Sequence, residues 1–240
     1  TFNANVPLSF ANAFTLNTGG TLASTGAVTL NGAFNWGGSS TLSGAGLLTT
    51  TGTTTVSGPN NSIQKNWTNT GALGFGGGND QMLFDAIGAT LTNQGTIDLG
   101  SSTSGTPIVH NSGPVASLVN TSTGVVSKGT AGLQNLPGGI TFTNDGTVNV
   151  TAGTLRLDGG GTDTGLYTVS SGALLQFNAT RTLGAGSNVT GAGNVNVTNG
   201  ALDVNALYGI AATGTTSVTN NGTFNANVPL SFANAFTLNT

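Results

Sequence analysis

Residues 142–159, FTNDGTVNVTAGTLRLDG, contain two short alternating segments separated by a glycine-containing turn. Alternate side chains of an extended segment point to opposite sides of the chain. Val148, Val150, Leu155 and Leu157 would therefore share one apolar side, and polar residues lie between them. This pattern favours two β-strands that are buried on one side, and the Asn-Asp-Gly sequence before them is typical of a tight turn.

The beginning of this stretch recurs along the chain as an apolar residue, Thr and Asn, a Gly, a small residue and then alternating apolar positions. The copies are LTTTGTTTV (48–56), WTNTGALGF (67–75), LTNQGTIDL (91–99), VNTSTGVVS (119–127), VSSGALLQF (169–177), VTNGALDV (197–204) and VTNNGTFNAN (218–227). Their turn glycines are Gly52, Gly71, Gly95, Gly124, Gly146, Gly172, Gly200 and Gly222, and Gly32 begins the series. The eight intervals from Gly32 to Gly222 cover 190 residues, a mean of about 24, which is a period typical of a solenoid. We predict an all-β chain that forms a parallel β-solenoid without helices, with about nine or ten coils in each 222 residues.

Threonine recurs three residues before many of these glycines. The positions are Thr49, Thr68, Thr92, Thr121, Thr143 and Thr219. Stacked coils place equivalent residues above one another, so these threonines are expected to form a ladder along a corner. The recurrent asparagines also hydrogen-bond without charge, so they too can form side-chain ladders. Charged residues make up only 5% of the chain, which is consistent with stacked coils because like charges in a column would repel.

The composition excludes several classes of protein. Four Lys and Arg residues are scattered, so we expect no nucleic-acid partner, which would require a clustered basic patch. No apolar run is long enough for a membrane helix, so we expect no membrane insertion by this segment. The absence of cysteine excludes a disulfide framework and a cysteine-based metal site.

The sequence TFNANVPLSFANAFTLNT occurs twice without a change, at 1–18 and at 223–240. We interpret residues 1–222 as one solenoid repeat unit and residues 223–240 as the first residues of the next identical unit. The expected partners are further copies of the same unit, head to tail, most simply in one long polypeptide. Lateral association of such fibres is a second arrangement that we consider.

The phrases TNNGTxxV, LSGAGxL and VTNGxLxV resemble the repetitive passenger regions of large bacterial surface proteins, namely filamentous-haemagglutinin-like adhesins and autotransporter passengers. The resemblance covers nearly the whole chain. It implies a right-handed parallel β-helix, export to the cell surface and a fibrous or adhesive role, with no catalytic residues to carry over. We therefore expect a structural repeat unit of an extracellular fibre or giant surface adhesin, and not an enzyme.

Three aspartates are the best candidates for a metal site, although we expect no cofactor. Asp80 lies in GFGGGNDQML (74–83), which loosely resembles the calcium-binding nonapeptide of bacterial β-rolls. Asp158 and Asp163 lie in LDGGGTDTG (157–165), which resembles it less. Such sites need adjacent copies of the motif, and each of these segments occurs once, so a glycine-rich loop without metal is the simpler interpretation.

Two other functions are alternatives. A polysaccharide-active β-helix enzyme would use grouped aspartates, here Asp145, Asp158 and Asp163, but Asp145 occupies a turn position that holds Asn or Gln in other copies. A carbohydrate- or ice-binding module would use a flat array of Thr-x-Thr pairs, which here change phase from copy to copy. The proline-containing regions 101–116, which includes the single His110, and 128–139 are expected to protrude as loops and are the best candidates for a binding surface.

Overall fold

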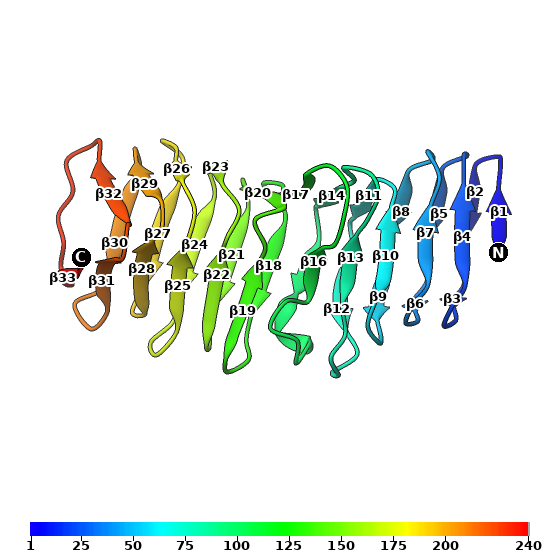
Figure 1. Ribbon diagram of the computed structural model, residues 1–240, viewed down its shortest axis with the longest axis horizontal. Coiled ribbons are helices and arrows are strands. Elements are labelled where there is room, and N and C mark those ends of the chain that lie inside the picture. Colours follow the sequence, from blue (N-terminus) through cyan, green and yellow to red (C-terminus); the bar gives the residue numbers. More distant parts are fainter. Residues whose placement is uncertain (240) are drawn as a thin grey trace.

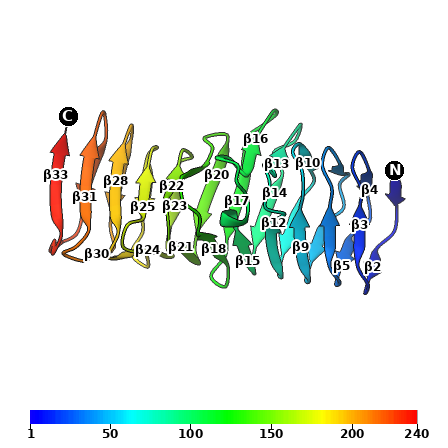
Figure 2. The same ribbon diagram turned by 90° about the horizontal axis from the view of Figure 1, so that it is seen from below.

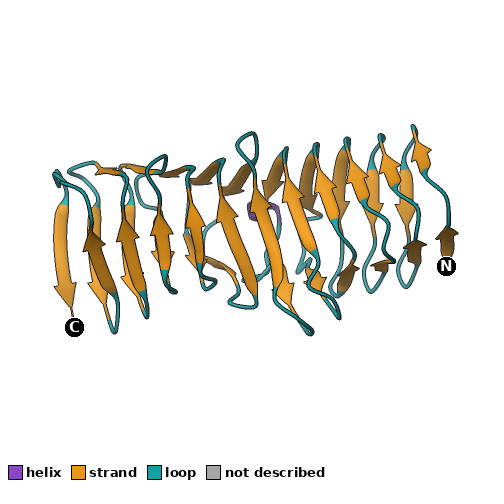
Figure 3. Ribbon diagram, turned by 90° about the horizontal axis from the view of Figure 1, so that it is seen from above, coloured by secondary structure: helices purple, strands orange, loops and turns teal. Residues whose placement is uncertain are grey.

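The computed structural model describes residues 1–239, which form a rod of stacked coils with the two termini at opposite ends (Figure 1). All strand pairs are parallel, and three strands form one coil, so the prediction of a parallel β-solenoid is confirmed. The strands lie on three sides of the rod, which we call faces 1, 2 and 3 in the order in which the chain passes through them (Figures 2 and 3).

Face 1 consists of two consecutive sheets. Its strands are β1 (Phe2–Ala4), β4 (Thr21–Ser24), β7 (Thr41–Ser43), β10 (Asn61–Gln64), β13 (Met82–Phe84) and β16 (Ile108–His110), followed by β19 (Leu133–Leu136), β22 (Thr154–Leu157), β25 (Leu174–Phe177), β28 (Asn194–Thr198), β31 (Thr215–Thr219) and β33 (Ala235–Asn239). The second sheet continues the first because β19 contacts β16.

Face 2 also consists of two sheets, and face 3 of one. The strands of face 2 are β2 (Leu8–Phe10), β5 (Val28–Leu30), β8 (Leu48–Thr50), β11 (Trp67–Asn69), β14 (Thr90–Asn93), β17 (Ala116–Asn120) and β20 (Ile140–Asn144), followed by β23 (Gly161–Asp163), β26 (Arg181–Leu183), β29 (Ala201–Val204) and β32 (Thr223–Ala226). The strands of face 3 are β3 (Phe14–Leu16), β6 (Phe34–Trp36), β9 (Thr53–Val56), β12 (Ala72–Phe75), β15 (Thr96–Asp98), β18 (Val125–Lys128), β21 (Thr147–Val150), β24 (Leu166–Val169), β27 (Asn188–Gly191) and β30 (Leu207–Ile210). Contacts between β20 and β23 join the two parts of face 2.

The core is a column of apolar side chains that runs the length of the rod. On face 2 the inward residues of seven consecutive coils pair in register: Leu8, Val28, Leu48, Trp67, Leu91, Leu118 and Phe142. Consecutive coils are therefore held by backbone hydrogen bonds along the axis and by apolar contacts inside, and each coil depends on its neighbours.

The chain completes eleven coils, and β33 begins a twelfth. Residues 1–222 contain the 31 strand positions from β1 to β31, or 10⅓ coils, slightly more than the nine or ten expected. The difference arises because the turn glycines do not all lie at one corner. Gly146 follows face 2, Gly172 follows face 3 and Gly200 follows face 1, so each interval between them contains one coil and one additional face.

Coil length varies most in the middle of the rod. Phe2 pairs with Leu22 near the N-terminus, whereas Thr96 pairs with Val125, so the coil that follows β15 is clearly longer. The additional residues form loops around the short 3-10 helix η1 (Leu99–Ser101), the single helical element that the structure describes in 1–239. The expected loops at 101–116 and 128–139 are shorter than predicted, since β16 and β19 lie within them.

Candidate functional site

Five of the eight predicted turn glycines stack in one column at the corner between faces 2 and 3. They are Gly52, Gly71, Gly95, Gly124 and Gly146, and Gly32 precedes them. A Cβ on Gly71 would lie 2.1 Å from the carbonyl oxygen of Gly52, and one on Gly95 would lie 2.0 Å from that of Gly71. The close backbone approach of successive corners therefore requires glycine. Gly172 lies between faces 3 and 1, and Gly200 and Gly222 lie between faces 1 and 2.

The predicted threonines stack only in part. Thr49, Thr68 and Thr92 pair in register on face 2, and the column continues through Val119 to Thr143. Thr121 lies beyond the end of β17, and Thr219 lies on face 1, where it pairs with Thr198. The stacked threonines point outward and are half-buried.

A second ladder, which we call the asparagine ladder, lies one residue further along and points into the core. It consists of Asn69, Asn93, Asn120 and Asn144, none of which is exposed to solvent. Each amide Nδ2 donates to the Oδ1 of the next asparagine, at 2.9, 2.8 and 2.8 Å. Side-chain ladders of Thr and Asn are predicted from the sequence, but these four asparagines are not singled out by it. The available signal is the Asn beside Thr in the recurring motif.

Polar groups complete both ends of the asparagine ladder. At one end, Thr50 Oγ1 donates to Asn69 Oδ1 over 3.2 Å and accepts from the indole nitrogen of Trp67 over 2.9 Å. At the other end, Asn144 Nδ2 donates to the carbonyl oxygen of Leu166 over 3.2 Å, and the backbone N–H of Asn144 donates to Asp163 Oδ1 over 2.9 Å. The result is a buried polar spine whose members find partners in neighbouring coils, as buried polar groups require.

Asp163, a predicted calcium candidate, is fully buried and paired with Arg181. Arg181 donates through Nη2 to Asp163 Oδ1 at 2.5 Å and through Nε to Oδ2 at 3.1 Å. It also donates to the carbonyl oxygens of Gly159 and Phe142, both at 2.9 Å. This ion pair satisfies both charges inside the core.

The other candidate aspartates also bind groups of the protein itself. Asp158 accepts hydrogen bonds from Arg156, Asn135 and Asn178. Partial burial opposes ionisation of Asp158, but these three hydrogen bonds outweigh it and lower the pKa of its carboxyl group.

Asp80 accepts from the backbone N–H groups of Gly58 at 2.5 Å and Gly78 at 3.0 Å. Asp145 accepts from the Thr164 hydroxyl at 2.6 Å at a corner, apart from the interior Asp163. Within residues 1–239, no three His, Cys, Asp or Glu side chains gather as a metal site would require.

A hollow lies between two loops at the corner between faces 3 and 1. We call residues 99–107 and 129–132 the loop cluster. The hollow has a volume of about 210 Å³ and is lined by Ser102, Thr103, Thr130, Ala131, Gly132, Leu133 and Gln134. It is smaller than most small-molecule sites, which are about 300–1,000 Å³. His110 lies on neighbouring β16, with its Nε2 3.1 Å from the carbonyl oxygen of Pro114.

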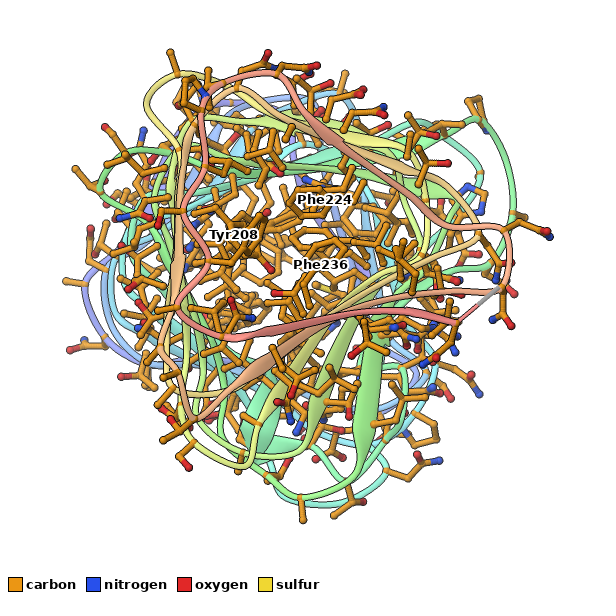
Figure 4. The ribbon with its side chains drawn as sticks, turned by 90° about the vertical axis from the view of Figure 1, so that its left-hand side faces the viewer. Tyr208, Phe224 and Phe236 are labelled. Carbon is orange, nitrogen blue, oxygen red and sulfur yellow. The ribbon has the colours of Figure 1, made fainter. Side chains whose placement is uncertain are left out.

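Residues 1–18 and the described residues 223–239 of the second copy form the two end coils, and both have a core of three phenylalanines. In the first copy Phe2, Phe10 and Phe14 approach with ring centroids 6.0, 6.3 and 5.1 Å apart. In the second copy the equivalent residues are Phe224, Phe232 and Phe236, at 5.9, 5.4 and 5.0 Å. Figure 4 shows Phe224 and Phe236 pointing into the rod beside Tyr208.

Comparisons with family models, curated proteins and solved structures gave no match to this chain. Among residues 1–239, no helix has the length and apolar character needed to cross a membrane.

Proposed function

We propose that residues 1–222 are a structural repeat unit of a long extracellular fibre or surface adhesin that extends by stacking coil on coil. The observation that carries this proposal is that one 18-residue sequence forms both end coils with the same aromatic core. A coil that fits at either end of the rod can also lie between two units. The partners are further copies of the same unit.

The unpaired edges of the rod support the same proposal. Among the described strands, the three of the first coil have a parallel partner on one side only, and so have β30, β32 and β33 at the other end. Such edges are open templates for further strands. The second unit would pair with them through the backbone, without a separate adhesive surface.

The load along the fibre would be carried by backbone hydrogen bonds and by the buried polar spine. Both are directed from coil to coil, so axial stretching is opposed by many bonds in series and in parallel. The extracellular setting and the adhesive role rest on the resemblance to surface-protein passengers. The loop cluster is our candidate for an adhesive surface because it departs most from the regular coil.

Rod length tests the structural part of the proposal. Chains with one, two and three units should be rods that lengthen by about 50 Å per unit, since each unit has 10⅓ coils spaced by ~4.8 Å. Small-angle scattering and negative-stain microscopy would measure this. Separate compact units joined by flexible linkers, with a variable distance between them, would contradict the proposal.

The size of the natural polypeptide under denaturing conditions tests the covalent arrangement. The expected result is a chain far heavier than the 23.5 kDa of these 240 residues. A natural chain near that mass would contradict covalent tandem repeats and would require separate subunits that stack end to end.

A further inference from the structure

We propose that the next copy of this unit joins the C-terminal end of the rod shifted by one face, so that its first strand lies on face 2 and not on face 1. Successive units are then rotated by about a third of a turn about the axis of the rod, and we call this rotation the one-face turn. The inference rests on the proposed function, because it describes how one unit joins the next. It adds a property that tandem repetition alone does not imply.

The two copies of the 18-residue sequence lie on different faces of the same rod. In the first copy, β1 lies on face 1, where Asn3 pairs with Ala23. In the second copy, the same residues form β32 on face 2, where Asn225 pairs with Asp203 and donates to its Oδ1 over 2.6 Å. The equivalent third strands differ in the same direction, because β3 lies on face 3 and β33 lies on face 1.

The second copy nevertheless keeps the aromatic centre of the first, although residues 230–232, the equivalent of β2, form no strand. Its three phenylalanine rings meet at the centre with centroid distances within about 1 Å of those in the first copy. Each of the three segments of this coil supplies one phenylalanine to the centre, so the coil has an approximate threefold interior. Such a coil fits on the one below it after a turn by one face, since an aromatic ring then replaces an aromatic ring.

The turn has a simple origin in the number of strands. A unit contains 31 strand positions, which is one more than ten coils of three. The recurring motif with its turn glycine shifts in the same way within the unit. It lies between faces 2 and 3 at Gly146, but between faces 1 and 2 at Gly200 and Gly222. The motif is therefore compatible with more than one corner, as a repeated one-face turn requires.

The turn determines where an array presents its loops. The loop cluster of one unit lies between faces 3 and 1, and in the next unit it would lie between faces 1 and 2. Three units would return it to the first corner after 31 coils. A fibre built in this way exposes its most variable surface on three sides, so a binding partner meets the same loops from any direction.

Paired cysteines test the turn, since the chain has no cysteine of its own. Thr237 points outward on β33 beside Ser217 of β31. Without the turn it would lie on face 3, beside Gly209 of β30, as its equivalent Thr15 lies beside Asn35. Adjacent parallel strands bring paired residues within disulfide range, whereas cysteines on different faces cannot be joined without backbone movement.

We expect Ser217→Cys with Thr237→Cys to form a disulfide and Gly209→Cys with Thr237→Cys to remain reduced, both in the 240-residue chain and in a two-unit chain. Thr15→Cys with Asn35→Cys is the matched positive control, because it probes the same sequence in the first copy. A disulfide in the Gly209 variant would overturn the one-face turn, whether or not the Ser217 variant also forms one. The absence of a disulfide in both variants, while the control pair forms one, would overturn it as well. Rod length measured on the same two-unit chain separates the two proposals. A rod that lengthens by about 50 Å while the Gly209 pair bonds would contradict the turn alone, and a rod that does not lengthen would contradict the stacked array and the turn with it.

Discussion

At the scale of single residues, the interior of this solenoid contains uncharged polar groups, one buried ion pair and two buried lysines that donate to hydroxyl and carbonyl oxygens. The asparagine ladder carries one hydrogen-bonded amide per coil and ends where Asn144 Nδ2 donates to the carbonyl oxygen of Leu166. An asparagine can donate to one neighbour and accept from the other, so identical residues can stack indefinitely. Aspartate or lysine could not do so, because each either only accepts or only donates.

Asn93→Ala should destabilise the chain by about 2–4 kcal/mol, because it leaves a donor of Asn69 and an acceptor of Asn120 without their partner inside the core. Chemical denaturation would measure the loss. The outward neighbour Thr92 is the control, and Thr92→Ala should change the free energy of unfolding by no more than about 0.5 kcal/mol. Equal losses for both variants would show that the ladder contributes nothing specific.

Lys65 should make stability depend on pH. Its side chain is 1% exposed, it donates to Ser24 Oγ and to the carbonyl oxygen of Ser43, and it makes no ion pair among the described residues. Burial lowers the pKa of Lys65 from 10.5 to about 8. Between these values the unfolded chain binds more protons than the folded chain, so stability rises with pH, by up to roughly 3 kcal/mol.

Replacing this lysine isolates the effect. Lys65→Met should remove the part of this rise that Lys65 contributes between about pH 8 and 10 and leave the part that Lys128 contributes, as measured by urea unfolding at each pH. Burial also lowers the pKa of Lys128, so Lys128→Met is a control that keeps the contribution of Lys65. A pH profile of the Lys65 variant that matches the parent would disprove the assignment.

At the scale of the structural element, the corners decide how closely the coils can stack. The strands are only three to five residues long, so the turns make up a large part of each coil. At the corner between faces 2 and 3, Gly52, Gly71 and Gly95 lie directly on one another in consecutive coils. Backbone packs there against backbone, and no side chain can move aside to make room.

Gly71→Ala should therefore destabilise the chain by about 1–3 kcal/mol, because the new methyl group would lie 2.1 Å from the Gly52 carbonyl oxygen and 2.5 Å from that of Thr51. Thermal unfolding would detect the change. Gly209 has no atom within 4 Å of the position of an added Cβ and lies in a strand. Gly209→Ala should leave the stability unchanged or raise it by about 0.5 kcal/mol, and similar losses at both positions would refute the stacking argument.

At the scale of the whole molecule, the rod is a one-dimensional stack in which only the two end coils of the described chain lack a neighbour. Stability in such a stack grows with the number of coil interfaces. The end coils are the weak points: Phe2 and Phe236 remain 40% and 39% exposed there, although both rings belong to the aromatic core of their coil. A second unit would cover one such end and add the interfaces of a whole unit.

A two-unit chain should consequently unfold as one longer stack. The denaturant concentration at its unfolding midpoint should exceed that of the 240-residue chain. The slope of its unfolding free energy against denaturant concentration should rise about twofold, because more surface is buried. The control inserts a flexible Gly/Ser linker after Gly222, which interrupts the stack without removing a residue. If the linked and unlinked chains unfold alike, the units do not stack on each other.

The fold class, the repeat and the residue types at the corners could all be predicted from the amino-acid sequence. Alternating Val and Leu define an inside and an outside, and glycine and asparagine define turns, because these are local preferences of the backbone and of burial. The identity of 1–18 with 223–240 also predicts that 1–222 is one repeat unit. The local sequence does not show at which of the three corners each turn lies.

The placement of the coils on one another became visible only in three dimensions. Gly146 and Gly172 have similar sequence contexts but lie at different corners. Because the strands are short, the sequence does not show whether the interval between two such glycines contains three strands or four. The same ambiguity concealed the asparagine ladder, which depends on the register of neighbouring coils, and the one-face turn of the second copy. Register is a property of pairs of strands, so it appears only when coils distant in sequence are brought side by side.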